Sequence, residues 1–297
     1  MAVYTAIDNP ELYFQTKIYT GDGNDDRDIV FDVTDTSMQP NFLWSARRDS
    51  GDNLSIYDSV RGDGKELRTA ETGGEYDRSD NIQALNSNGF QVGTDGQVNA
   101  SGGTYVSWGW KESATAGFDI LLYTGNATNR TISHSLSAVP EVVIVKRRDS
   151  STAWSSLHLA IGDSTDRMVL NDTAALEDDA TFWQDTDPTS SVFTLGTSSS
   201  TNVDTGTFVA YLWAPKQGYS KFGTFIGNGN DNGPFVYTGF RPAWTMIKCT
   251  SAADHWPIDD NKRSPHNFMQ NTLRANLTNA EYTGSAYGID FLSNGFK

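Results

Sequence analysis

An acidic run near the start of the chain contains residue types that bind hard cations. Residues 22–28 read Asp-Gly-Asn-Asp-Asp-Arg-Asp, with side-chain oxygens at every second position. Calcium takes roughly six to eight oxygen ligands, and carboxylates at this spacing are typical of its binding loops. The run lacks the central glycine and the closing glutamate of such a loop, since Val33 stands in the latter place. We therefore predict a hairpin turn here and no metal site.

The histidines and the paired acidic residues are the next candidates for chemistry. No histidine lies three to five residues from another with cysteine or carboxylate ligands placed for zinc. Two carboxylates can flank a glycosidic bond, but acidic pairs arise by chance in a chain with 37 acidic residues. We predict structural or surface positions for all of these side chains, which are His134, His158, His255, His266, Asp178-Asp179 and Asp259-Asp260.

Two tryptophans are the stronger binding candidates. Trp183 and Trp256 stand in polar, loop-like stretches, where an exposed indole could stack on a sugar ring. The favoured alternative is that each indole fills the open end of its own β-sandwich. Arg61-Gly62-Asp63 is interpreted as a polar loop without an adhesion role. The sequence assigns no catalytic, cofactor-binding or metal-binding residue, so we predict that the protein is not an enzyme and needs no cofactor.

The overall composition favours short strands and limits the possible partners. Aromatic residues reach 12% in a background of turn-forming residues, and no segment keeps a helical apolar period over three turns. The net charge of −15 disfavours nucleic acid as a partner. No apolar run approaches the roughly 18 residues of a membrane span, and we predict no membrane insertion. The N-terminus shows no secretory signal, and Cys249 is the single cysteine, so folding in a reducing cytosol is expected.

The chain resembles itself at intervals of roughly 100 residues. Tyr19-Thr20-Gly21 recurs as Tyr123-Thr124-Gly125 and as Phe225-Ile226-Gly227. A proline precedes an apolar run in each copy, at Pro40, Pro140 and Pro242. We therefore predict an N-terminal segment, residues 1–16, followed by three homologous antiparallel β-sandwiches. These are unit 1 (17–112), unit 2 (118–215) and unit 3 (222–297), joined so closely that they should pack together around a pseudo-threefold axis.

The closing strand is the clearest element of the repeat. Residues 105–110 (Tyr-Val-Ser-Trp-Gly-Trp) match residues 208–213 (Phe-Val-Ala-Tyr-Leu-Trp). Because side chains alternate along a strand, Val106, Trp108 and Trp110 share one face, which should contact a core. The opposite face carries Ser107 and Gly109, small enough to lie beneath another layer.

A further set of motifs occupies residues 132–136, 139–141, 188–196, 218–223 and 235–242. Together these motifs resemble a repeated domain of unknown function in structural proteins of marine tailed bacteriophages, especially those infecting cyanobacteria. The resemblance covers nearly the whole chain from Asp8 onward. It implies a virion protein, made and folded in the host cytoplasm, whose partners are other virion proteins and copies of itself. It transfers no catalytic or binding residue.

From the resemblance and the repeats we expect a component of a tail fibre or spike with an assembly or host-surface-binding role. Two alternatives stay open. One is a head (capsid) decoration protein, with a different place in the particle. The other is a carbohydrate-binding or glycan-cleaving tailspike that contacts a host surface glycan.

Unit 3 differs from the other units in its last residues. Phe90 and Phe193 are each followed by a closing strand, whereas their counterpart Phe296 is followed only by Lys297. A sandwich without that strand would expose core and an unpaired edge. We expect either that the native polypeptide continues for at least about 20 residues, which the resemblance favours, or that a neighbouring subunit donates the strand.

Overall fold

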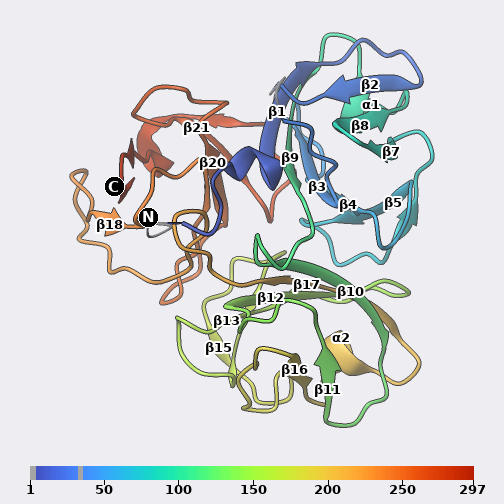
Figure 1. Ribbon diagram of the computed structural model, residues 1–297, viewed down its shortest axis with the longest axis vertical. Helices are drawn as coiled ribbons and strands as arrows, with labels where there is room; N and C mark the ends of the chain where they lie inside the picture. The colour runs from blue at the N-terminus through green and yellow to red at the C-terminus, as the bar shows by residue number, and fades with distance from the viewer. Residues whose placement is uncertain (1–4, 33–35) are drawn as a thin grey trace.

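The structure is a computed structural model that describes residues 5–32 and 36–297. It is 36% strand and 5% helix, and every strand pairing is antiparallel. The predicted all-β class is therefore confirmed. Figure 1 shows three groups of sheets arranged around a common centre.

The first group consists of a six-stranded sheet and a smaller sheet that covers it. The large sheet has the order β1 (Phe14–Thr20), β9 (Thr104–Trp110), β3 (Phe42–Arg47), β4 (Ser55–Asp58), β5 (Lys65–Arg68) and β6 (Tyr76–Asp77). The small sheet has the order β2 (Arg27–Val30), β8 (Gly89–Val92) and β7 (Ile82–Asn86). A single helical turn, α1 (Gly96–Asn99), leads from the small sheet into β9.

The second group has the same strand order in its large sheet. The order is β10 (Phe118–Thr124), β17 (Thr207–Trp213), β12 (Val142–Arg147), β13 (Ser155–His158), β14 (Asp166–Val169) and β15 (Glu177–Asp178). Its small sheet pairs β11 (Arg130–Ser133) with β16 (Val192–Leu195), and α2 (Ser199–Asn202) precedes β17.

The third group has a shorter large sheet. Its order is β19 (Trp244–Met246), β20 (Pro257–Asp260), β21 (Asn271–Arg274) and β22 (Tyr282–Thr283). The small sheet has the order β18 (Val236–Tyr237), β24 (Gly295–Phe296) and β23 (Phe291–Leu292). Two 3₁₀ turns, η1 (Pro10–Leu12) and η2 (Ser285–Tyr287), complete the described elements.

The N-terminal boundary differs from the prediction. β1 begins at Phe14, inside the segment assigned to the extension, because residues 14–16 continue the ladder with β9 as far as Trp110. The side chain of Phe14 packs on Trp110 with 4.7 Å between ring centroids, so this part of the chain belongs to the first large sheet.

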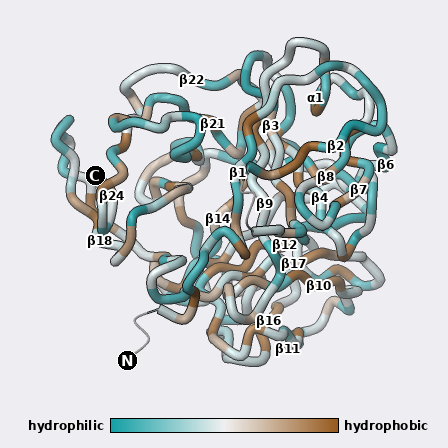
Figure 2. The backbone as a smooth tube through the Cα atoms, turned by 45° about the horizontal axis from the view of Figure 1, so that its top comes forward, coloured by the Kyte–Doolittle hydropathy of each residue, from teal (hydrophilic) through white to brown (hydrophobic). Residues whose placement is uncertain are grey.

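The two faces of the central strands contact different cores, as the alternation predicts. Val106 and Trp108 of β9 face a hydrophobic cluster shared by all three groups, whereas Tyr105 faces the core of its own group. Gly109 lies beneath the small-sheet layer, where an added Cβ would come within 2.7 Å of the Phe31 ring. Figure 2 shows hydrophobic stretches in the interior, for example along β10 and β17, and hydrophilic loops at the periphery.

Candidate functional site

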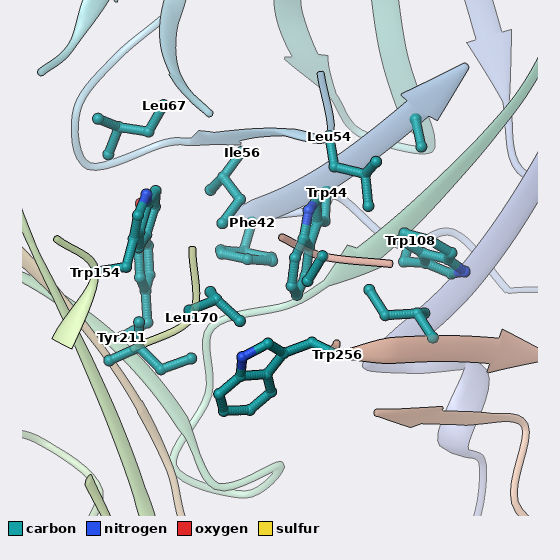
Figure 3. Close-up of a cluster of buried hydrophobic side chains, with 14 of the residues drawn as sticks. Phe42, Trp44, Leu54, Ile56, Leu67, Trp108, Trp154, Leu170, Tyr211 and Trp256 are labelled. Atoms are coloured by element: carbon teal, nitrogen blue, oxygen red, sulfur yellow. The ribbon is translucent and has the colours of Figure 1, made fainter. Parts of the chain in front are cut away.

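The most extensive buried feature is a hydrophobic cluster, here called the shared core, to which all three units contribute. Figure 3 shows the side chains of Phe42 and Trp108 (unit 1), Trp154 and Tyr211 (unit 2) and Trp256 (unit 3) converging in it. Each of these side chains is at most 5% exposed. The shared core therefore makes each unit depend on its neighbours for burial of its large sheet.

Aromatic rings in the shared core meet edge to face. Phe42 lies 5.0 Å from Tyr211 and 5.6 Å from Phe118, both in unit 2, and Trp110 lies 5.3 Å from Trp244 in unit 3. Such pairs contribute roughly 0.5–1.5 kcal/mol beyond the area that they bury. The geometry fixes the orientation of the units as well as their contact.

Two buried carboxylates receive hydrogen bonds from a neighbouring unit. Tyr211 Oη donates to Asp58 Oδ2 at 2.7 Å, and Trp108 Nε1 donates to Asp260 Oδ2 at 3.0 Å. In both cases an arginine three residues later, Arg61 or Arg263, pairs with the same oxygen at 2.5 Å. All four charged side chains are fully buried, so removing one partner would leave an uncompensated charge.

A second layer of ion pairs joins the same units. Arg148 of unit 2 forms a bidentate ion pair with Glu75 of unit 1, with two hydrogen bonds of 2.8 and 3.0 Å. Arg48 of unit 1 forms the same kind of pair with Glu281 of unit 3, with two hydrogen bonds of 2.9 Å. Bidentate pairs of this kind are stronger and more directional than single ion pairs. They sit beside backbone bonds between units, which are Glu75 N to Arg148 O, Leu176 N to Thr250 O and Glu281 N to Arg48 O.

Between units 2 and 3, the residues that the structure describes form no ion pair of this kind. His158 ends β13, as Asp58 ends β4 and Asp260 ends β20. Its ring lies 6.3 Å from Phe222, and its buried Nδ1 has no hydrogen-bond partner in the described part of the chain. Burial lowers the pKa of the His158 imidazole. A hydrogen bond to its own backbone opposes this effect of burial.

Two lysines stabilise the loops at the junctions. Lys146 Nζ donates to the carbonyl oxygens of Thr72, Arg147 and Thr152 at 3.0–3.1 Å. Lys248 makes the same set of three bonds, to Thr173, Cys249 and Asp254. Burial lowers the pKa of Lys146 to about 7, while the three carbonyl oxygens favour its charged form. The ammonium groups act as structural donors between units.

Asp259 allows a pH-dependent test of this packing. Burial raises the pKa of its carboxyl to about 6, although Thr272 Oγ1 donates to Oδ1 at 2.7 Å. Because the folded pKa exceeds the unfolded value, the folded state binds more protons between about pH 4 and 6, and stability falls as the pH rises through that window. We expect the free energy of unfolding of Asp259→Asn, relative to that of wild type, to rise by about 2–3 kcal/mol as the pH is raised from 4 to 7. Urea unfolding at both pH values measures this gain, and a difference independent of pH would contradict it.

The acidic run at residues 22–28 forms a turn, as predicted. Asp22 Oδ1 accepts from Asn24 N at 2.9 Å, and Asn99 from the start of the closing segment holds the loop through Asp22 N and Asn24 O. Asn202 holds residues 126 and 128 in the same way in unit 2. Among residues 5–32 and 36–297, no three His, Cys, Asp or Glu side chains gather as a metal site would require.

The sugar-stacking hypothesis is wrong for both tryptophans. Trp183 is 0% exposed and lies in the core of unit 2. Trp256 is 5% exposed and packs in the shared core, where its Nε1 contacts the carbonyl oxygens of Val169 and Asp172 at 3.2 Å. Trp183 fills its own sandwich, as the favoured alternative held. Trp256 instead fills the junction with unit 2.

The other candidates are scattered. His134 Nε2 lies 3.1 Å from Thr189 O, His255 Nδ1 lies 3.0 Å from Asn276 Nδ2, and His266 is exposed. Asp259 and Asp260 are buried, whereas Asp178 is exposed. Asp179 Oδ1 accepts a hydrogen bond from Thr181 N. The arginine of Arg61-Gly62-Asp63 is buried in its ion pair. None of these residues forms a common site.

Sequence reasoning missed the residues that join the units. The signal was present, because Asp-x-x-Arg begins at the last residue of a short strand at Asp58–Arg61 and again at Asp260–Arg263. It also missed Glu112 beside the link between units 1 and 2. Burial, followed by the neighbouring Asp119 carboxyl, raises the pKa of Glu112 to about 7.

The fold and its junctions define an all-β protein whose three units share one core. Residues 9–297 match the family model described as Domain of unknown function (DUF7483), and the chain belongs to this family. No curated protein and no solved structure matches the chain. Within the described residues, no helix has the length and apolarity needed to cross a membrane.

Proposed function

We propose that this protein is a non-enzymatic structural component of a bacteriophage virion, part of a tail fibre or spike with an assembly or host-surface-binding role. The motif resemblance motivates the virion assignment. The structural observation that supports it is the shared core, in which aromatic and ionic contacts hold the units as one body. A rigid body of this kind suits a repeated building block that works with other virion proteins and with copies of itself.

The proposal includes three homologous units around a pseudo-threefold axis. Its support is that like contacts run in one direction around the centre. The backbone bonds join unit 1 to unit 2, unit 2 to unit 3 and unit 3 to unit 1. The side-chain bonds to the buried carboxylates run from a donor in unit 2 to unit 1 and from a donor in unit 1 to unit 3, which is the opposite direction but again the same for both bonds. A closed ring of like contacts is what such an axis would produce.

Cryo-electron microscopy of purified particles tests the virion assignment. Density that fits this chain at the tail, in repeated copies, is the expected result. Density on the head would favour a capsid decoration protein. Absence of the protein from purified particles, measured by mass spectrometry, would contradict a virion role.

Incubation with host surface polysaccharide separates the binding role from a glycan-cleaving tailspike. We expect no release of oligosaccharide over the course of the assay, with or without binding. Released oligosaccharide would show that the protein is an enzyme. The burial of Trp183 and Trp256 leaves the cleaving alternative without its two aromatic candidates.

A further inference from the structure

Three carbonyl oxygens surround a lysine ammonium at two of the three junctions between units. Lys146 and Lys248 each donate to the carbonyl oxygens of the residues one and six positions later in their own unit. Each also donates to a threonine of the preceding unit, Thr72 or Thr173, and all six bonds measure 2.9–3.1 Å. The ammonium therefore satisfies backbone oxygens from both sides of its junction.

The third junction, between units 3 and 1, has the same backbone frame. Glu281 N donates to Arg48 O at 2.8 Å, in the position of the backbone bonds that join the other two junctions. Thr278 lies three residues before this donor, as the two threonines above lie three residues before theirs. A Cβ added to Gly51 would come within 3.0 Å of Thr278 O, so this oxygen faces the loop that follows β3.

No lysine reaches into this third junction. Ala46 occupies the fifth position of β3, where β12 carries Lys146 in its fifth position. The residues one and six positions after Ala46 are Arg47 and Asp52. In the described chain, the carbonyl oxygens of Asp52 and Thr278 accept no hydrogen bond. The oxygens that correspond to those around the two ammonium groups therefore lack a donor here.

The acidic residue that accompanies the ammonium in unit 3 has a counterpart in unit 1. Asp52 Oδ1 accepts from Asn53 N at 2.9 Å, as Asp254 Oδ1 accepts from His255 N at 2.7 Å. Burial lowers the pKa of Lys248, and the Asp254 carboxylate opposes this effect, so the two charges interact. Asp52 thus has the local geometry of Asp254 without a lysine beside it.

The two arginines that act on Asp52 already have carboxylate partners. Arg47 Nε pairs with Asp49 at 3.0 Å, and Arg68 Nε pairs with Glu66 at 3.1 Å. Burial raises the pKa of the Asp52 carboxyl, and the two arginines offset that rise only in part. A further positive charge beside Asp52 would therefore stabilise its ionised form.

We propose that the junction of units 3 and 1 binds one potassium ion through the carbonyl oxygens of Arg47, Asp52 and Thr278, with the Asp52 carboxylate as counter-charge. Carbonyl oxygens can replace the hydration shell of potassium. The set contains one carboxylate, whereas calcium sites usually gather several. A monovalent cation therefore takes the place that the lysine ammonium has at the other two junctions. This inference does not depend on the location of the protein in a particle.

Thermal unfolding of the full chain at constant ionic strength provides the test. Potassium chloride replaces choline chloride in steps, so that screening of the net charge stays the same while the bound ion changes. We expect Tm to rise by about 2–4 °C at saturating potassium, with the concentration dependence of a single site. An unchanged Tm would contradict the proposal, because a cation that binds the folded state must stabilise it.

Matched variants test the assigned ligands. Ala46→Lys supplies the ammonium of the other junctions, so its Tm in choline should approach that of wild type in potassium, and potassium should then have no effect. Asp52→Asn removes one unit charge near the ion and should raise the potassium concentration of half-maximal effect about tenfold. Asp63→Asn is the control, because Asp63 is an exposed carboxylate in another loop of unit 1. It should leave the potassium dependence unchanged.

Thallium(I), a heavy mimic of potassium, locates the site directly in crystals of the full chain. We expect an anomalous peak beside Thr278 O. A potassium dependence that persists in Ala46→Lys, or that is the same in Asp52→Asn and wild type, would overturn the proposal. So would the absence of thallium from this junction, which would leave water as the partner of these carbonyl oxygens. If Ala46→Lys does not fold, Asp52→Asn and the thallium peak decide.

Discussion

Trp108→Ala is expected to lower the free energy of unfolding by about 3–5 kcal/mol, the usual cost of truncating a buried tryptophan. The indole is fully buried in the shared core and contacts Trp44 and Trp244 with ring centroids 6.2 and 6.4 Å apart. Its removal leaves a cavity between units 1 and 3 and takes one donor from Asp260. Urea unfolding followed by circular dichroism measures the change.

Trp108→Phe separates the two contributions. It keeps most of the ring but removes the N–H group, so a loss of about 1–2 kcal/mol is expected. Val30→Ala serves as a surface control, because Val30 is 51% exposed, and should change stability by less than about 0.5 kcal/mol. A loss below about 1 kcal/mol for Trp108→Ala would show that the shared core does not stabilise the fold.

Arg263→Met is expected to destabilise the protein by about 3–5 kcal/mol, because it leaves the buried carboxylate of Asp260 without its counter-charge. The guanidinium also donates to Ile258 O at 2.7 Å and to Glu281 at 3.1 Å, so its loss affects both layers of the junction. Asp260→Asn in the same chain should recover part of the loss, since residue 260 then carries no buried charge that needs a partner. A double-mutant cycle measures that coupling.

The control for the ionic prediction is the exposed pair of Lys65 and Asp77. Their side chains are 34% and 83% exposed, so solvent screens the charges, and Asp77→Ala should cost less than about 1 kcal/mol. Arg61→Met should reproduce the effect of Arg263→Met, because Asp58 and Arg61 have the same geometry. Additive effects of Arg263→Met and Asp260→Asn would contradict the assigned pair.

The closing strands could be predicted from sequence because a two-residue period directly specifies two faces. Val106 and Trp108 face one core and Tyr105 faces another, as their alternation requires. The small residues opposite were equally informative, since Gly109 lies directly under Phe31.

The junctions could not be predicted in the same way. Glu75 and Arg148 are far apart in sequence, and in an acidic chain each has the pattern of an ordinary surface charge. Trp256 follows Asp254 and His255, which made its segment look like an exposed loop. Its burial comes from unit 2, and the local pattern of one unit carries no information about which neighbour covers it.

Native-state hydrogen exchange with increasing urea tests the shared core most directly. If the three units form one body, the most protected amides of β9, β17 and β20 should open with the same free energy and the same urea dependence. The opening free energies of these amides should remain equal to one another at every urea concentration below the unfolding transition. Separate opening of β20, or of β9 and β17, with distinct free energies would show that the units fold independently and would contradict the shared core.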